Sequence, residues 1–98
     1  MPSISKKATE KSPPKGITFP EILEIILLFN INEMKKYYPN INKDNIFKSE
    51  VYSRILKINL QTMIQTFQKT KKPLTQYEKS FVIACKTYIN KINRLHNI

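Results

Sequence analysis

The stretch that decides the fold is IFKSEVYSRILKINLQTMIQTFQKT, residues 46 to 70. At 100° per residue its apolar and polar side chains fall on opposite stripes, which indicates an amphipathic helix. The apolar stripe holds Tyr52, Leu56, Leu60, Met63 and Phe67, and the polar stripe holds Glu50, Arg54, Lys57, Gln61, Gln65 and Gln68. The cations of residues 69 to 73 favour a helix end, because they stabilise the negative terminus of the helix dipole. We therefore predict a helix over residues 46 to 70.

A second helix is predicted upstream, where Pro20 is suited to a first helical turn and Glu21 and Glu24 favour the positive end of the dipole. Residues 22 to 29, ILEIILLF, are almost all apolar, so we expect this helix to be covered on most sides and central to the fold. Residues 30 to 39, in which Asn30 and Glu33 have the spacing of a capping box, either continue it or form a separate short helix. Residues 40 to 45, NINKDN, are typical of a turn.

A last helix is predicted to run from the T-x-x-E capping box of Thr75 and Glu78 to about Leu95. Its apolar stripe holds Tyr77, Phe81, Ala84, Cys85, Tyr88, Ile92 and Leu95, with Lys79, Lys86, Asn90 and Arg94 pointing away. No strand-like alternation competes with these patterns. The predicted class is all-α, a small bundle of three main helices plus one short helix.

Residues 1 to 17 lack a pattern able to form a core, and we expect a disordered basic tail ahead of a helical domain of residues 18 to 98. Its cations are Lys6, Lys7, Lys11 and Lys15. The sequence from Ser12 to Lys15, SPPK, has the S-P-x-K form used by proline-directed kinases, which makes Ser12 a candidate phosphorylation site. A phosphate there would offset much of the local positive charge.

The residue inventory argues against an enzyme and against a bound cofactor or metal. Cys85 is the one cysteine and His96 the one histidine, and on one helix about 16 Å of rise separates them. A single cysteine excludes an intramolecular disulfide, which fits an intracellular, reducing compartment. The most apolar run, residues 22 to 29, has eight residues with Glu24 among them. It is far short of the ~20 of a transmembrane segment, and no cleavage site of a signal peptide follows it.

The net charge of +10 predicts a polyanionic partner, with nucleic acid as the leading candidate and DNA or RNA undecided. Fifteen lysines against two arginines favour phosphate contacts with little sequence choice. The candidate contacts are Lys6, Lys7, Lys11, Lys15, Arg54, Lys57, Lys69, Lys71, Lys72, Lys86 and Arg94. Small size and an A/T-rich codon bias are compatible with a viral or mobile-element accessory protein, acting in a nucleus or at a site of viral replication.

The alternative is a protein-interaction module, either a homodimer or a subunit of a larger assembly. Several apolar residues lie outside the predicted stripes and could form a contact patch: Ile41, Ile46, Phe47, Val51 and Ile58. Peripheral membrane binding ranks third, because the helices lack Trp or Phe anchors opposite their basic faces. A continuous basic face joining Arg54, Lys57, Lys86 and Arg94 would favour nucleic acid; scattered lysines would not.

Overall fold

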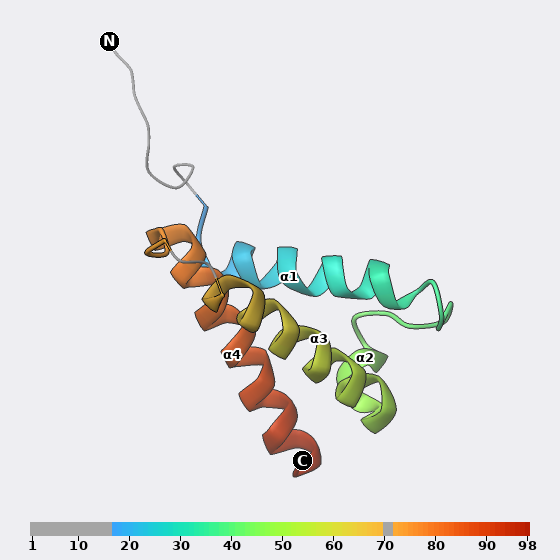
Figure 1. Cartoon of the computed structure of the whole chain (residues 1–98). Helices are drawn as coiled ribbons and strands as arrows, with labels where there is room; N and C mark the ends of the chain where they lie inside the picture. The colour runs from blue at the N-terminus through green and yellow to red at the C-terminus, as the bar shows by residue number, and fades with distance from the viewer. Residues whose placement is uncertain (1–16, 70–71) are drawn as a thin grey trace.

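The computed structural model describes residues 17–69 and 72–98, and every regular element in these residues is a helix (Figure 1). The helices are α1 (Phe19–Met34), α2 (Asn45–Lys48), α3 (Glu50–Gln68) and α4 (Gln76–His96). The predicted class, with three main helices and one short one, is therefore confirmed. The predicted tail lies outside the described residues except for Ile17, which is half-buried and packs against the core.

Two of the long helices begin with a capping box. The Thr18 hydroxyl accepts the backbone N–H of Glu21, and the Glu21 carboxylate accepts the backbone N–H of Thr18 at 2.8 Å. Thr75 and Glu78 make the same reciprocal pair at the start of α4, as their spacing predicts. Each box satisfies backbone donors that have no intrahelical partner.

The helix predicted over residues 46 to 70 is interrupted at Ser49, whose backbone is extended at φ −83° and ψ 125°. The Ser49 hydroxyl accepts the Tyr52 N–H at 3.2 Å and so caps α3. The buried hydroxyl of Ser53 reaches back across the break, lying 2.8 Å from the carbonyl oxygen of Ile46 and 3.2 Å from that of Phe47. The extended backbone of Ser49 thus separates α2 from α3, and the contacts of Ser53 hold the two helices together.

The short helix of the bundle is therefore α2, because α1 continues through the first part of residues 30 to 39 and ends at Met34. Asn30 is not a cap: it lies inside α1 and donates its side-chain N–H to the carbonyl of Ile26 at 2.8 Å. The asparagine-rich loop is a turn, as predicted. Its Asn42 side chain accepts the backbone N–H of Asp44 at 2.8 Å and that of Asn45 at 2.9 Å.

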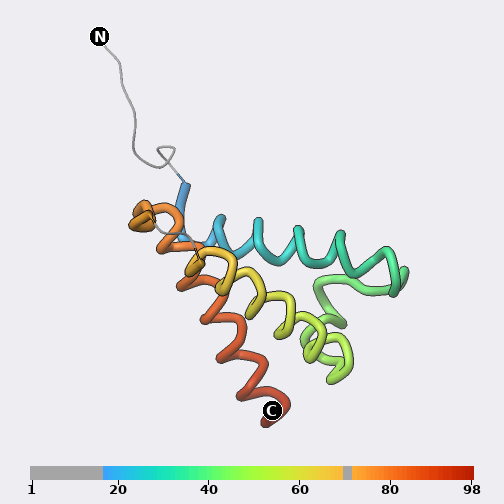
Figure 2. The backbone as a smooth tube through the Cα atoms, viewed as in Figure 1, coloured from blue at the N-terminus to red at the C-terminus, as the bar shows by residue number. Residues whose placement is uncertain are grey.

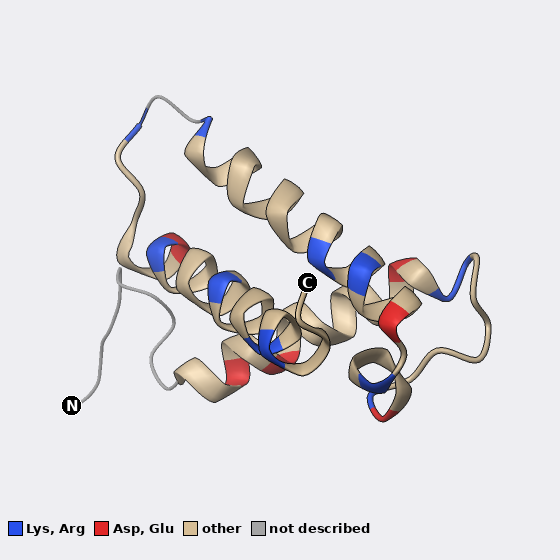
Figure 3. Cartoon of the chain, turned by 90° about the horizontal axis from the view of Figure 1, so that it is seen from below, with Lys and Arg blue, Asp and Glu red and all other residues tan. Residues whose placement is uncertain are grey.

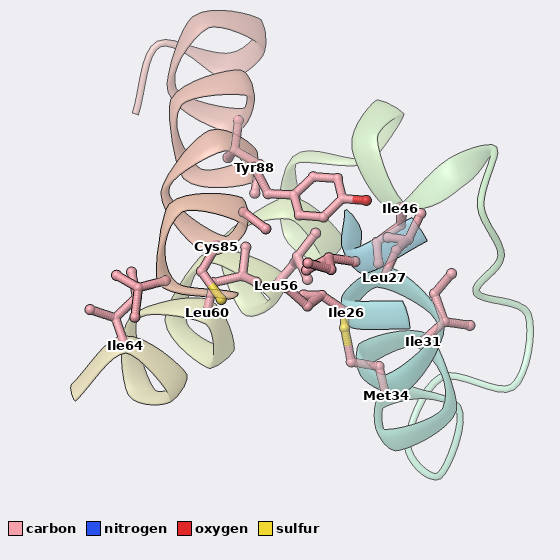
Figure 4. Close-up of a cluster of buried hydrophobic side chains, with 14 of the residues drawn as sticks. Ile26, Leu27, Ile31, Met34, Ile46, Leu56, Leu60, Ile64, Cys85 and Tyr88 are labelled. Carbon is pink, nitrogen blue, oxygen red and sulfur yellow. The ribbon is translucent and has the colours of Figure 1, made fainter. Parts of the chain in front are cut away.

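The core is shared by all four helices, and α4 is its central element. Helix α4 packs against both α1 and α3, whereas α2 packs against α3. Figure 2 shows α1 and α3 joined by the loop and α2 at one end of the bundle, and Figure 3 shows the start of α1 and the end of α3 on opposite sides of α4. The close-up in Figure 4 shows side chains of all four helices pointing into one interior, among them Ile26, Ile46, Leu60 and Cys85.

Helix α1 is less covered than its composition predicts. One side packs into the core through Ile22 and Ile26, but three large apolar residues on the other side remain exposed. Ile25 is 44 % exposed, Leu28 41 % and Phe29 54 %. The expectation that α1 is covered on most sides is therefore wrong, because α4, rather than α1, has helices on two sides.

Polar and aromatic contacts around Tyr88 join three helices. The Tyr88 hydroxyl of α4 donates to the carbonyl of Leu23 in α1 at 2.6 Å, and its ring stacks on Phe47 of α2 with centroids 5.7 Å apart. The Lys91 ammonium lies 4.3 Å from the Phe47 ring centroid. His96 Nε2 lies 2.5 Å from the Phe47 carbonyl oxygen; because a carbonyl can only accept, this nitrogen carries the proton.

Removing the Tyr88 hydroxyl with Tyr88→Phe should lower the free energy of unfolding by about 1 kcal/mol, since a buried interhelical hydrogen bond is lost. Tyr37, which is 78 % exposed, supplies the matched control, and Tyr37→Phe should change stability by less than about 0.5 kcal/mol. Urea denaturation followed by circular dichroism measures both. Equal effects of the two substitutions would contradict the role given to Tyr88.

Candidate nucleic-acid interface

Charge is divided unevenly between the helices. Helix α1 contains three glutamates and no lysine or arginine, whereas α4 contains four cations and one acidic residue. The acidic residue, Glu78, belongs to the capping box. Figure 3 shows basic positions spread along the length of α4. The described part of the chain thus has a basic helix and an acidic helix packed together.

Two of the predicted contact residues are engaged within the protein. Arg54 donates two hydrogen bonds to one carboxylate oxygen of Glu50, at 2.9 Å from Nε and 2.7 Å from Nη2. The half-buried Lys57 donates to the Asn93 side chain at 2.7 Å and to the Ile98 carbonyl at 3.1 Å. Lys57 therefore links α3 to the end of α4. The continuous face of Arg54, Lys57, Lys86 and Arg94, which would have favoured nucleic acid, is not available as a set of four free cations.

Three other cations lie on the exposed side of α4. Lys79, Lys86 and Arg94 are all exposed, while Cys85 and Ile92 of the same helix are fully buried on the opposite side. The described residues supply none of these three cations with a hydrogen bond or ion pair. At 1.5 Å of rise per residue they extend over about 22 Å. They form a widely spaced row, which we call the α4 cation row.

A second group of cations lies at the connection between α3 and α4. Lys69 is exposed and follows the last residue of α3, and Lys72 is exposed on the far side of the gap in the described chain. Lys71 lies outside the described residues, as do Lys6, Lys7, Lys11, Lys15 and Ser12. Figure 3 shows this connection on the opposite side of α4 from the start of α1.

The middle of α3 carries no charge between residues 58 and 68, visible in Figure 3 as a long uncharged stretch. Gln61, Gln65 and Gln68 are exposed there, as the predicted polar stripe requires. The Thr62 and Thr66 hydroxyls are already used, because each donates to the carbonyl four residues earlier. The glutamine amides are thus the exposed hydrogen-bonding groups of this stretch.

A groove between α1 and α3 escaped the sequence analysis. It has a volume of about 250 Å³ and is lined by Phe29, Asn30, Glu33, Asn59, Thr62 and Met63. Asn30 is 1 % exposed, and its side-chain N–H groups reach the Ile26 carbonyl and, at 3.6 Å, the Met63 sulfur. The spacing of Asn30 and Glu33 had indicated a helix cap, which concealed the position of Asn30 inside a helix.

The predicted contact patch of the alternative function is split by the structure. Ile41 and Ile46 are buried in the core and Phe47 is half-buried against Tyr88. Val51 and Ile58 remain on the surface of α3, at 59 % and 60 % exposed. The largest exposed apolar cluster on one helix is instead that of α1.

The thiol of Cys85 and the side chain of Tyr88 are buried. Cys85 is fully buried, and burial raises the pKa of its thiol to about 11. Burial, with smaller contributions from Glu24 and Cys85, raises the pKa of the Tyr88 phenol to about 12.

Within residues 17–69 and 72–98, no group of three or more His, Cys, Asp or Glu side chains is placed to hold a metal. No helix in this part of the chain combines the length and the apolar character needed to span a bilayer.

The chain matches no protein-family profile, no curated protein and no solved structure.

The pKa of Cys85 predicts a loss of stability in alkali. A thiol with the ordinary value of 9.0 ionises in the unfolded chain before the folded one, whose value is about 11. The free energy of unfolding should therefore fall as pH rises through this interval, since the unfolded state binds fewer protons. Urea denaturation across the interval measures the slope.

Cys85→Ala should make that slope shallower, whatever its effect on stability at neutral pH. A slope unchanged by the substitution would show that other groups cause the alkaline loss. Tyr88 adds its own loss at higher pH, because its pKa rises from 10.0 to about 12.

Proposed function

We propose that this protein binds nucleic acid through phosphate contacts made by the α4 cation row and by the Lys69 and Lys72 corner. The separation of charge between α4 and α1 carries the proposal. A polyanion is attracted to α4 and repelled by the glutamates of α1, so the field favours one binding orientation. The exposed ammonium and guanidinium groups of Lys79, Lys86 and Arg94 are free to take phosphate oxygens.

The side chains available favour binding with little sequence choice. Lysine presents a point charge, and of the two arginine forks suited to bidentate base reading, that of Arg54 is directed to Glu50, which leaves Arg94. The cations of the α4 row are spaced along the helix rather than gathered into a pocket. The exposed glutamines of α3 could add hydrogen bonds to bases or sugars, but phosphate contacts would supply most of the affinity.

The tail would act as an auxiliary arm. It would add the four positive charges of Lys6, Lys7, Lys11 and Lys15 to those of the helical domain. Phosphorylation of Ser12 would reduce its contribution by adding about −1.5 to −2 charge. DNA and RNA share the phosphate backbone, so both are candidate ligands.

Neutralising the α4 cation row with Lys79→Gln, Lys86→Gln and Arg94→Gln should weaken binding to a short labelled DNA duplex and to the matching single strands of DNA and RNA. Because each lost duplex phosphate contact removes about 0.9 from the slope of log K against log salt, the slope should become shallower by about 3. Fluorescence anisotropy at several salt concentrations measures the slope.

A control variant removes three positive charges from the residues that follow the end of α1. The triple variant Lys35→Gln, Lys36→Gln and Lys43→Gln has an equal net charge, and Lys36 and Lys43 already face Glu33 and Glu24. It should retain most of the affinity and of the slope. Equal losses of affinity in the two variants would show that binding depends on net charge alone. If the unaltered protein does not bind at low salt, the proposal is wrong.

Deleting residues 1 to 16 should reduce affinity and make the salt slope shallower by up to about 4, because four lysines are lost. Ile17 stays in the shortened chain because it packs against the core. Circular dichroism should show an unchanged melting transition. Complete loss of binding with an intact fold would transfer the site from α4 to the tail.

A further inference from the structure

One side of α1 faces solvent along its whole length. The core-facing side holds Ile22 and Ile26, and Figure 1 shows no other helix over the side opposite α3 and α4. Exposed residues at intervals of three and four continue along this side into the turn after α1: Glu21, Ile25, Leu28, Phe29, Asn32 and Lys36. We call these residues the outer stripe. Lys36 belongs to it because the backbone of Lys35 is still helical, at φ −61° and ψ −21°.

The outer stripe is complementary to itself. It has an acid at its start, Glu21, apolar residues in its middle and a base at its end, Lys36, with its midpoint between Leu28 and Phe29. If two stripes packed antiparallel, Glu21 of each would lie beside Lys36 of the other, and the apolar centres would meet. Packed parallel, they would bring like charges together. A two-fold axis requires such a self-complementary surface.

We propose that two copies of this chain associate through the outer stripe, with α1 antiparallel to α1 of the second copy about a two-fold axis near Leu28 and Phe29. This contact removes from water the cluster formed by Ile25, Leu28 and Phe29 on each chain. Lys36 now pairs with Glu33 on the protein surface, where an ion pair contributes little and can be exchanged for one with the second copy.

The distribution of charge favours a second copy over this surface. Two chains of net charge +10 repel each other, yet the outer stripe holds one acid, Glu21, and one base, Lys36, and so adds no net charge to the contact. The neighbouring part of α3, residues 58 to 68, contributes no charge. The outer stripe is therefore where two copies meet with the least repulsion, and the α4 cation row stays outside the contact.

The groove beside Phe29 offers room at the edge of this interface. Asn30 lies at its lining, and the described residues supply no hydrogen bond to its side-chain oxygen. A buried amide oxygen without a donor is unfavourable. A polar side chain of the second copy that enters the groove could satisfy it.

Sedimentation equilibrium of the full chain without nucleic acid tests the proposal directly. The unaltered protein should dimerise reversibly, and Phe29→Asp should raise the dissociation constant at least about tenfold. Ile83 on the outer side of α4 supplies the matched control, since it is also 54 % exposed. Ile83→Asp should leave the dissociation constant unchanged.

A charge exchange tests the antiparallel geometry. Lys36→Glu alone places carboxylates opposite each other and should weaken the dimer, and adding Glu21→Lys should restore it, although the capping box with Thr18 is then lost. In a second measurement, Leu28→Cys should form an intermolecular disulfide readily under mild oxidation, whereas Ile83→Cys should not. The native Cys85 is buried and does not compete.

A protein that stays monomeric at all concentrations overturns the proposal, as does a dimer that Phe29→Asp and Ile83→Asp weaken equally. Failure of the charge exchange together with slow oxidation of Leu28→Cys overturns the antiparallel arrangement. Because nucleic acid is absent from these experiments, their outcome is independent of the function proposed for the α4 cation row.

Discussion

Tyr88 is the residue through which α4 contacts both α1 and α2. Tyr88 lies on α4, bonds to the backbone of α1 through Leu23 and stacks on Phe47 of α2. A tyrosine can do this because its ring is apolar and its far end is polar, so it crosses the core and still satisfies its hydroxyl. Helix α2, with four residues, could not be stable alone; Phe47 and the hydroxyl of Ser53 give it a fixed position.

The long helices were predictable because their signals are local. The 3.6-residue period of α3 and α4 and the capping box of Thr75 and Glu78 depend on neighbouring residues alone. The break at Ser49 was missed because the periodic pattern runs through it. A serine followed by an acidic residue is nevertheless typical of the start of a helix, as here at Ser49 and Glu50. The exposed side of α1 was missed for another reason: a helix apolar on nearly every side carries no information about which side is buried.

The candidate site shows the same division between local and tertiary information. Exposure of Lys79, Lys86 and Arg94 followed from the apolar stripe of α4. The pair of Arg54 with Glu50 could have been predicted, since residues four apart on a helix are neighbours. The hydrogen bonds of Lys57 to Asn93 and Ile98 could not have been predicted, because they depend on how α3 crosses α4. The sequence therefore identified the exposed cations of α4 but could not say which of the other described cations were already engaged.

The contacts of Lys57 and His96 also bear on how the chain reaches its fold. Lys57 meets Asn93 across 36 residues and Ile98 across 41, and His96 meets Phe47 across 49. Most contacts in a helical protein are local and form quickly, whereas contacts distant in sequence require large loops to close first. The individual helices can therefore form early. The contact of Tyr88 with Leu23 of α1 spans 65 residues. The bundle becomes complete when α4 meets α1, α2 and the first half of α3, and we expect these closures to be the slow steps of an otherwise fast topology.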